Sequence, residues 1–295
     1  MLRVMAKQRV TLVGAGNLAR ALAMLLPAAG YRVDEIVTRT GSRKMQSARR
    51  LARSQGAKLA TMENSELAGD IVWLAVSDSA IRSCATVLTG KGPWGTKVFF
   101  HSSGALSSDE LSSLRKQGAS VASVHPMMTF VAGDIPSLRG VAWTVEGDTT
   151  AVRTARQILQ AMGGTVVRID KDKKALYHAF GAFLSPLLVV HLNTAATIAE
   201  AAGISPKDLK RFMEPIIRRT LDNLFAHLGE KDGPGKAFSG PLVRGDISTI
   251  ERHLRALRKT PKARALYHAL AEAAVGSNLP VENRRALRQL LHSRP

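Results

Sequence analysis

Two histidines stand where polar side chains leave apolar, strand-like runs. His101 ends the run 97–101, and His125 follows the run 120–124 and precedes Pro126. The ordinary pKa of histidine lies near neutrality, so its imidazole can give or take a proton during a reaction. We predict His125, whose backbone the following proline restricts, as the first catalytic residue and His101 as the second. The alternative role of His101 is a hydrogen bond to a nearby loop.

A glycine-rich turn near the N-terminus indicates which elements position these side chains. The apolar run 9–13 leads into Gly14 and Gly16 and then into a helix-forming segment, and a second strand is predicted over residues 31–38. Gly14 permits a sharp turn, Gly16 lets the backbone approach a diphosphate, and the free N–H groups of the helix start bind it. This arrangement is typical of a dinucleotide-binding βαβ unit. The predicted cofactor contacts from this turn are Gly14, Gly16, Asn17 and Leu18.

The end of the second predicted strand indicates which dinucleotide is bound. An NAD site places an acidic residue there for the ribose hydroxyls, whereas an NADP site needs cations and hydroxyls for the additional phosphate. Asp34 and Glu35 lie too early in the strand for that role, and two arginines follow its end. The sequence therefore favours NADP, bound by Thr38, Arg39, Ser42 and Arg43. The alternative is a solvated helix start, which we expect of Arg49 and Arg50.

Strand-like and helix-like runs alternate through the first half of the chain. Strands are predicted over residues 57–61, 70–76, 97–101, 120–124, 141–146 and 165–169, and helices over 79–88, 107–116 and 149–162. This alternation is typical of an α/β fold with a doubly wound, Rossmann-type, mostly parallel sheet. Later helices are predicted over 171–202, 206–228, 247–258, 261–275 and 281–292. We therefore predict an NADP-binding domain over residues 1–169 and an all-helical C-terminal domain over 170–295.

Ligands of such sheets bind beyond the carboxyl ends of the strands, so the residues there are candidates for the site. Three that follow one strand are predicted to line the cofactor: Val76, Ser77 and Asp78. For Asp78 the alternative is a helix cap. Ser102 and Ser103 follow the first histidine, and either hydroxyl can hold the polar head of a substrate. We predict Ser102 as a catalytic residue and Ser103 as a further cofactor contact.

Lys174 and His178 lie four residues apart on the first helix predicted after the sheet, so they share one face of it. A lysine there can anchor a carboxylate or donate a proton, and we predict Lys174 as catalytic and His178 as substrate-binding. The alternative for Lys174 is a solvated side chain at a helix start. We interpret the segment that begins at Arg244 as a tight turn into a helix. Arg244 itself is predicted to bind an anionic substrate or a partner subunit.

The charge of the chain favours anionic ligands. The 295 residues carry 42 Lys and Arg against 23 Asp and Glu, a formal net charge of +19. The most basic runs, 252–262 and 284–294, alternate with Leu and Ala at helical spacing, so we interpret them as outer faces of amphipathic helices. No nucleic-acid module is present, and no specific nucleic acid partner is predicted. The alternative, a nucleic-acid binder, would show a steep salt dependence of binding.

The cysteine content and the hydropathy pattern indicate the cellular compartment of the protein. A single cysteine, Cys84, excludes an internal disulfide and a cysteine-based metal site. We therefore predict a reducing, cytoplasmic location and no metal. We expect no run to be long and apolar enough to cross a membrane, and we therefore predict no membrane partner.

Five segments together resemble a bacterial family of Rossmann-like proteins with a helical C-terminal domain of unknown function: GAGNLA (14–19), HSSGAL (101–106), VHPM (124–127), YH (177–178) and SGPLVRGD (239–246). The chain is more distantly similar to pyrroline carboxylate reductase, the deazaflavin-dependent NADP oxidoreductases and the 6-phosphogluconate dehydrogenase superfamily. The resemblance implies that the helical domain forms a homodimer and closes the substrate site. The segment around His125 also resembles one in the prephenate dehydrogenases, whose histidine contacts the substrate.

These observations together predict an enzyme. Reduction by a nicotinamide needs a hydride donor, an acid for the reduced group and side chains that hold the substrate. We predict an NADP-dependent oxidoreductase that transfers a hydride between the nicotinamide and a small, carboxylate-bearing carbonyl or imine. His125 is the predicted acid or base, and Arg244 or Lys174 holds the carboxylate. The alternative is a non-catalytic NADP(H)-binding sensor or regulatory protein, because one fold supports several functions.

Overall fold

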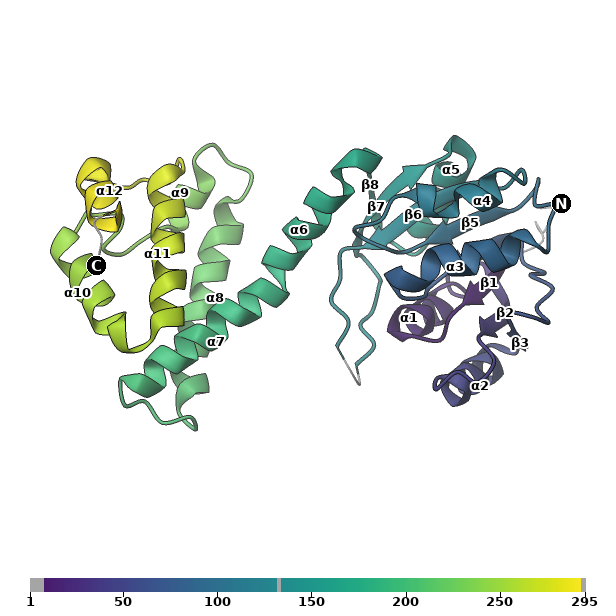
Figure 1. Ribbon diagram of the computed structural model, residues 1–295, viewed down its shortest axis with the longest axis horizontal. Helices are drawn as coiled ribbons and strands as arrows, with labels where there is room; N and C mark the ends of the chain where they lie inside the picture. The colour runs from purple at the N-terminus through teal and green to yellow at the C-terminus, as the bar shows by residue number, and fades with distance from the viewer. Residues whose placement is uncertain (1–7, 132–133, 293–295) are drawn as a thin grey trace. The chain divides into compact units, whose positions relative to one another are not determined.

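The computed structural model describes residues 8–131 and 134–292, and Figure 1 shows the order of the elements. Eight strands form one sheet in the order β3-β2-β1-β4-β5-β6-β7-β8. The strands are β1 (Arg9–Val13), β2 (Arg32–Thr38), β3 (Lys58–Thr61), β4 (Ile71–Leu74), β5 (Val98–His101), β6 (Ser120–Pro126), β7 (Ala142–Gly147) and β8 (Thr165–Arg168). Only the pairing of β6 with β7 is antiparallel among the paired strands of the described residues. The predicted mostly parallel sheet is confirmed.

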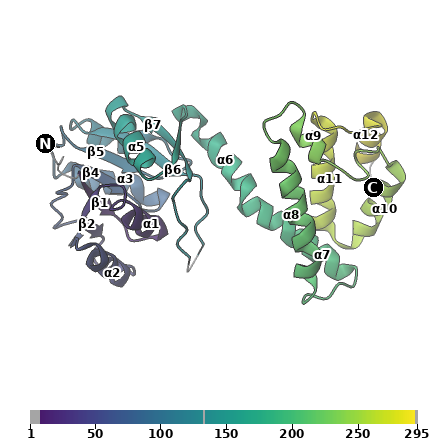
Figure 2. The same cartoon turned by 180° about the vertical axis from the view of Figure 1, so that it is seen from behind.

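Helices cover both faces of this sheet, as the doubly wound prediction requires (Figure 2). They are α1 (Asn17–Leu25), α2 (Met45–Gln55), α3 (Asp78–Thr89), α4 (Ser112–Arg115) and α5 (Thr149–Ala161), with the short 3-10 helix η1 (Ser108–Leu111) before α4. Successive strand residues point to opposite faces. Leu12 and Trp73 therefore pack with α1, α2 and α5 in one core, and Val13 and Leu74 pack with α3 and α4 in the other.

The strand order places a crevice at the carboxyl ends of β1 and β4. The chain proceeds from β1 outward to β2 and β3 on one side and then crosses to β4 on the other side. In open α/β sheets, ligands bind at such a point, where the direction of strand addition reverses. Val13 pairs with Leu74, and the backbone N–H of Ala75 donates to the carbonyl of Val13 over 2.8 Å. The glycine turn after β1 therefore lies against the segment that follows β4.

The contacts within the chain define two compact units, divided after Ser185. The second unit is helical, as predicted, with α7 (Pro186–Ala201), α8 (Leu209–His227), α9 (Gly233–Ala237), α10 (Ile247–Ala256), η3 (Leu257–Lys259), α11 (Pro261–Gly276) and α12 (Arg284–His292). Its core contains Ile250, Ala271 and Leu287. The predicted boundary at residues 169 and 170 coincides with the end of the sheet, whereas η2 (Lys171–Lys173) and α6 (Lys174–Leu184) belong to the first compact unit.

The single helix predicted over residues 171–202 is wrong, because Ser185 separates α6 from α7. Ser185 has φ −128° and ψ −83°, outside the helical region. Pro186 has no backbone N–H and restricts the residue before it, which explains the break. The loose connection predicted over residues 229–240 contains the short helix α9. Residues 293 and 294 of the basic run 284–294 lie outside the described residues.

The prediction that no run is long and apolar enough to cross a membrane is also wrong. The stretch Lys171–Ala201 has 31 residues, and its most apolar part has a mean hydropathy of 1.5, which is sufficient by length and composition alone. Some helices that never contact lipid have the same length and hydropathy. Lys174 is the only buried residue of α6, and neighbouring apolar side chains are exposed: Leu176, Phe180, Phe183 and Leu184.

Candidate active site

The turn after β1 has the backbone geometry of a dinucleotide-binding loop. Gly14 adopts φ +115°, and a Cβ there would collide with the carbonyl oxygen of Ala75. Gly16 is extended and precedes α1, and no side chain caps the start of that helix. The first N–H groups of α1 are thus free of a side-chain cap and can bind an anion. Only glycine satisfies the position of Gly14.

A cavity of about 530 Å³ opens beside this turn, at the carboxyl ends of β1, β2 and β4. Eight of the predicted cofactor residues line it: Gly14, Gly16, Thr38, Arg39, Ser42, Arg43, Val76 and Ser77. The lining residues that were not predicted as site residues include Lys44, Met62, Ala80 and Cys84. Burial raises the pKa of the Cys84 thiol, so it contributes an uncharged, apolar wall.

The end of the cavity next to β2 is positively charged. Neither Arg39 nor Arg43 makes an ion pair with the residues that the structure describes, and both line the cavity. The ammonium of Lys44 lies 3.6 Å from the position that a Cβ on Gly16 would occupy, so a third cation faces the glycine turn. The hydroxyl of Thr40 donates to Glu63 over 2.8 Å and is therefore already engaged.

The two acids of β2 lie away from this end of the cavity. Asp34 pairs with Arg32 and, at 3.7 Å, with Arg9. Glu35 is fully buried and accepts a hydrogen bond of 2.9 Å from Ser65. Neither carboxylate lines the cavity, so neither can bind a ribose there. The cations and hydroxyls at the end of β2 suit a phosphate group instead.

Four predicted cofactor residues lie outside the lining of the cavity. The amide of Asn17 donates to the carbonyl of Val131 over 3.0 Å, and Leu18 packs against the core. The hydroxyl of Ser103 donates to Asp78 over 2.7 Å and accepts from the backbone N–H of Leu106 over 2.9 Å. Ser103 and Asp78 therefore join the loop after β5 to the start of α3, which is a structural role.

Lys174 is 2% exposed, and its ammonium lies beneath the loop after β5. It donates to the carbonyl of Ser103 over 2.9 Å and to the hydroxyl of Ser123 over 2.6 Å. Burial lowers the pKa of Lys174 to about 8, although the charges of Glu146 and Asp78 act in the opposite direction. The interpretation of Lys174 as a solvated side chain is wrong, because a buried ammonium with two fixed acceptors is not solvated.

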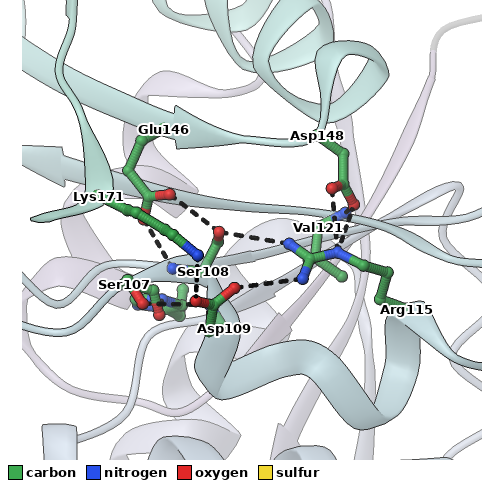
Figure 3. A network of polar contacts seen from close by, with 9 residues as sticks. Ser107, Ser108, Asp109, Arg115, Val121, Glu146, Asp148 and Lys171 are labelled. Atoms are coloured by element: carbon green, nitrogen blue, oxygen red, sulfur yellow. Dashed lines mark hydrogen bonds and ion pairs between the residues drawn. The ribbon is translucent and has the colours of Figure 1, made fainter.

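A network of ion pairs fixes the segment that carries Lys174 to the sheet (Figure 3). Lys171 lies 2.9 Å from Asp109, which lies 3.3 Å from Arg115, and Arg115 pairs with Asp148 over 3.0 Å. Beside it, both carboxylate oxygens of the buried Glu146 accept hydrogen bonds from Ser108, at 2.6 and 2.9 Å. These contacts explain why α6 begins where Lys174 can reach the loop after β5.

His125 forms a cluster with Tyr177 and His178, two residues of α6, beside the loop after β5. The Nδ1 atom of His125 lies 2.9 Å from the hydroxyl of Tyr177, and the ring of His178 lies 6.1 Å from that of His125. A Cβ on Gly104 would lie 2.8 Å from Nε2 of His125 and 2.6 Å from Cδ2 of His178, so glycine lets both rings approach the loop. Burial, together with the charge of Lys174, lowers the pKa of His125 to about 4.

Both ring nitrogens of His101 are already engaged. Its Nε2 lies 3.0 Å from the carbonyl oxygen of Ser107, and its Nδ1 accepts from the backbone N–H of Ser103 over 3.1 Å. His101 is fully buried, and burial lowers its pKa to about 4. The hydroxyl of Ser102 accepts a hydrogen bond of 2.8 Å from the indole of Trp73. The geometry thus favours the loop-bonding alternative for His101. Of these two histidines, His125 is the one whose Nε2 atom has no hydrogen-bond partner among the described residues.

The predicted substrate residues lie in different units. His178 is exposed on α6, and Arg244 is exposed before α10 in the second unit. Tyr177 and Ser123 were not predicted as site residues, although Tyr177 directly precedes His178. In the described ranges, 8–131 and 134–292, no group of three or more His, Cys, Asp or Glu residues could hold a metal ion.

Two family models match separate parts of the chain. Residues 9–99 match the family described as NADP oxidoreductase coenzyme F420-dependent, and residues 141–274 match a domain of unknown function, DUF2520. The resemblance stated from the sequence is thereby confirmed. No curated protein matches the chain.

Solved structures of similar fold cover nearly the whole chain. A protein from Thermotoga maritima is 23% identical with a TM-score of 0.70 and covers 96% of this chain and 98% of its own. An imine reductase from Myxococcus stipitatus in complex with NADP⁺ is 17% identical with a TM-score of 0.66, covering 96% and 99%. A reductive aminase from Aspergillus terreus in complex with NADPH and ethyl-5-oxohexanoate is 16% identical with a TM-score of 0.63, covering 96% and 99%. This chain has their fold.

Two histidines with lowered pKa values predict a loss of stability on acidification. Because His101 and His125 have pKa values of about 4 in the folded chain and near 6.5 when unfolded, the unfolded state binds more protons between those values. Stability is therefore retained above pH 6.5 and falls as the pH drops toward 4. We expect the free energy of unfolding to be about 3 to 4 kcal/mol lower at pH 5 than at pH 7.

Urea unfolding followed by tryptophan fluorescence measures this effect, because Trp73, Trp94 and Trp143 all lie in the first unit. The His125→Asn variant should lose only about half as much stability over the same interval, since one of the two titrating groups is gone. Equal free energies of unfolding at pH 5 and pH 7 would show that the imidazoles titrate normally.

Proposed function

We propose that this protein is an NADP-dependent oxidoreductase that reduces a small carbonyl or imine substrate. The observation that carries the proposal is the cavity at the crevice of the sheet, where a glycine turn meets Arg39, Arg43 and Lys44. A diphosphate fits the turn because a Cβ at Gly14 would close it, and a 2′-phosphate fits the guanidinium groups of Arg39 and Arg43, which have no ion-pair partner in the described part of the chain. The family model over residues 9–99 and the NADP(H) complexes of similar fold support this choice of cofactor.

NADPH, when bound, supplies the hydride that is added to the substrate carbon. The chain must supply the proton for the carbonyl oxygen or imine nitrogen. With a pKa of about 4, His125 is neutral at pH 7, so one of its ring nitrogens carries a hydrogen and the other accepts one. Burial raises the pKa of Tyr177, which keeps its hydroxyl protonated. In our proposal Tyr177 donates to Nδ1, and the hydrogen on Nε2 of His125 faces the substrate.

Nε2 of His125 gives its proton to the oxygen or nitrogen of the substrate, and Nδ1 takes the proton of Tyr177. After the product leaves, Nδ1 returns that proton to the tyrosine oxygen and Nε2 takes a proton from solvent, which restores the starting state. Lys174 has a different role in this proposal: its ammonium holds the carbonyl of Ser103 and the hydroxyl of Ser123, and so fixes the loop that contains Gly104. The binding of a substrate carboxylate by Arg244 or Lys174 stays a prediction.

A panel of carbonyl and imine compounds, with and without a carboxylate, tests the proposal through the oxidation of NADPH at 340 nm. Turnover above background with any member, and its loss in a variant of His125, is the expected result. If NADPH binds but no compound in the panel oxidises it, the sensor function predicted as the alternative replaces the enzyme.

We also propose that the chain forms a homodimer through its long helices. Large apolar side chains on α7 and α8 are exposed, and a single soluble chain rarely exposes so many. They include Leu187, Val189, Phe212, Ile216 and Phe225. The Ile216→Glu variant should sediment as a monomer where the wild-type chain sediments as a dimer, because a carboxylate is costly to bury. The Thr86→Glu variant on α3 adds the same charge and should remain dimeric; a monomeric wild-type chain would contradict the proposal.

A further inference from the structure

A second cavity lies entirely within the helical unit. It has a volume of about 330 Å³ and is lined by Arg258, Pro261, Arg264, Ala265 and His268. The last four occupy positions i, i+3, i+4 and i+7 of α11, so they share one face of that helix. Within residues 8–131 and 134–292, the lining contains two guanidinium groups and no carboxylate.

The guanidinium groups of this cavity have unused hydrogen-bonding capacity. The Nε atom of Arg264 is buried and has no hydrogen-bond partner among the described residues. Neither Arg258 nor Arg264 forms an ion pair within the part of the chain that the structure describes, whereas Arg255 on α10 pairs with Glu251. A buried donor without a partner is costly, and such a group in a cavity points to a bound ligand or ion.

The remaining groups around the cavity also favour an anion. Helix α11 has 16 residues, its first turn contains no acid, and no side chain caps its start. Its first N–H groups therefore carry partial positive charge toward the end at which Pro261 lies. His268 lies 2.6 Å from the carbonyl oxygen of Leu291 through Nε2 and 3.5 Å from Glu272 through Nδ1. Glu272 is the acidic residue in these contacts of His268, and it does not line the cavity.

We propose that this cavity binds a phosphate group, either inorganic phosphate or the phosphate of a small phosphorylated metabolite. Two arginines can bind the several oxygens of a phosphate dianion through paired N–H groups. A single carboxylate has only two oxygens and would leave some of these N–H groups without an acceptor. The cavity belongs to the second unit, and the NADP site proposed above belongs to the first, so the inference does not depend on the proposed function.

Calorimetric titration of the full chain with inorganic phosphate, at about 150 mM sodium chloride, tests this site. We expect saturable binding that the Arg264→Gln and Arg258→Gln variants each weaken at least tenfold. The Lys262→Gln variant removes the same charge from an exposed residue on the same helix, outside the lining, and should bind as the wild-type chain does. Arg258 is exposed, so its substitution leaves the fold intact even if that of Arg264 does not.

Three outcomes would overturn the proposal. The first is a wild-type chain that shows no saturable uptake of phosphate. The second is a heat of phosphate binding that disappears in the Arg39→Gln/Arg43→Gln double variant rather than in Arg264→Gln. That result would place the phosphate in the first unit. The third is an equal loss of binding in the Lys262→Gln variant, together with tight binding of a ten-nucleotide thymidine strand, which indicates a continuous polyanion surface. Competition by a phosphate monoester such as glucose 6-phosphate, at the same site, would support a metabolite ligand over the free ion.

Discussion

Replacing His125 with asparagine should lower kcat by at least about a hundredfold while leaving the affinity for NADPH unchanged. His125 is the histidine of the cluster whose Nε2 atom faces the space over Gly104, and its Nδ1 atom is held by Tyr177 at 2.9 Å. Asparagine keeps a polar side chain of smaller size but cannot relay a proton from one nitrogen to another. Because general acid catalysis contributes roughly 10²- to 10⁴-fold, we expect kcat to fall by about that factor.

The Tyr177→Phe variant separates proton supply from structure. It keeps the aromatic ring that packs edge-on against His125 at 5.5 Å and removes only the hydroxyl. We expect a fall in kcat of about tenfold with little change in KM, because solvent can partly replace the hydroxyl as a proton source. A His125→Asn variant that keeps wild-type kcat would show that the proton comes from another group. NADPH affinity is measured for each variant by fluorescence of the bound nicotinamide.

The second large effect concerns the choice of cofactor. The Arg39→Gln/Arg43→Gln double variant should weaken NADPH binding by at least about a hundredfold and leave NADH binding within threefold. Both guanidinium groups line the cavity and lack an ion-pair partner among the described residues, so both are free to bind a 2′-phosphate. A hydrogen bond to a charged group contributes about 1.5 to 3 kcal/mol, and two of them account for a factor of that size.

Helix α2 offers a matched control for this variant. Arg49 and Arg50 are exposed on α2, a few residues after Arg43, and do not line the cavity, and their double substitution by glutamine removes the same charge. It should lower the affinity for NADPH less than threefold, in line with the small effect of distant, solvent-exposed charges. If the two double variants lose equal affinity, the effect is the general positive field of the protein and not a specific phosphate site.

The sheet and the cofactor cavity could be predicted from the sequence because their signals are local. Apolar runs of strand length, a positive-φ glycine between strand and helix, and arginines after β2 all lie within a few residues of the element that they specify. The rules of parallel sheets then bring the ends of β1, β2 and β4 together. Eight predicted residues therefore meet at one cavity.

The roles of the residues around His101 could not be predicted, because they depend on contacts distant in sequence. Ser103 bonds to Asp78, 25 residues away, and Lys174 reaches Ser103 across 71 residues. A sequence shows that these side chains can donate or accept hydrogen bonds, but not that their partners already occupy them. For the same reason the burial of Lys174 and the participation of Tyr177 required the structure.

Calorimetric titration of the wild-type chain with NADPH and, separately, with NADH tests the central claim most directly. The account predicts saturable binding of one NADPH per chain, with NADH at least about a hundredfold weaker because it lacks the phosphate that Arg39 and Arg43 face. The absence of heat with either dinucleotide would contradict the account, since the glycine turn would then bind no diphosphate and the reductase built upon it would have no hydride donor.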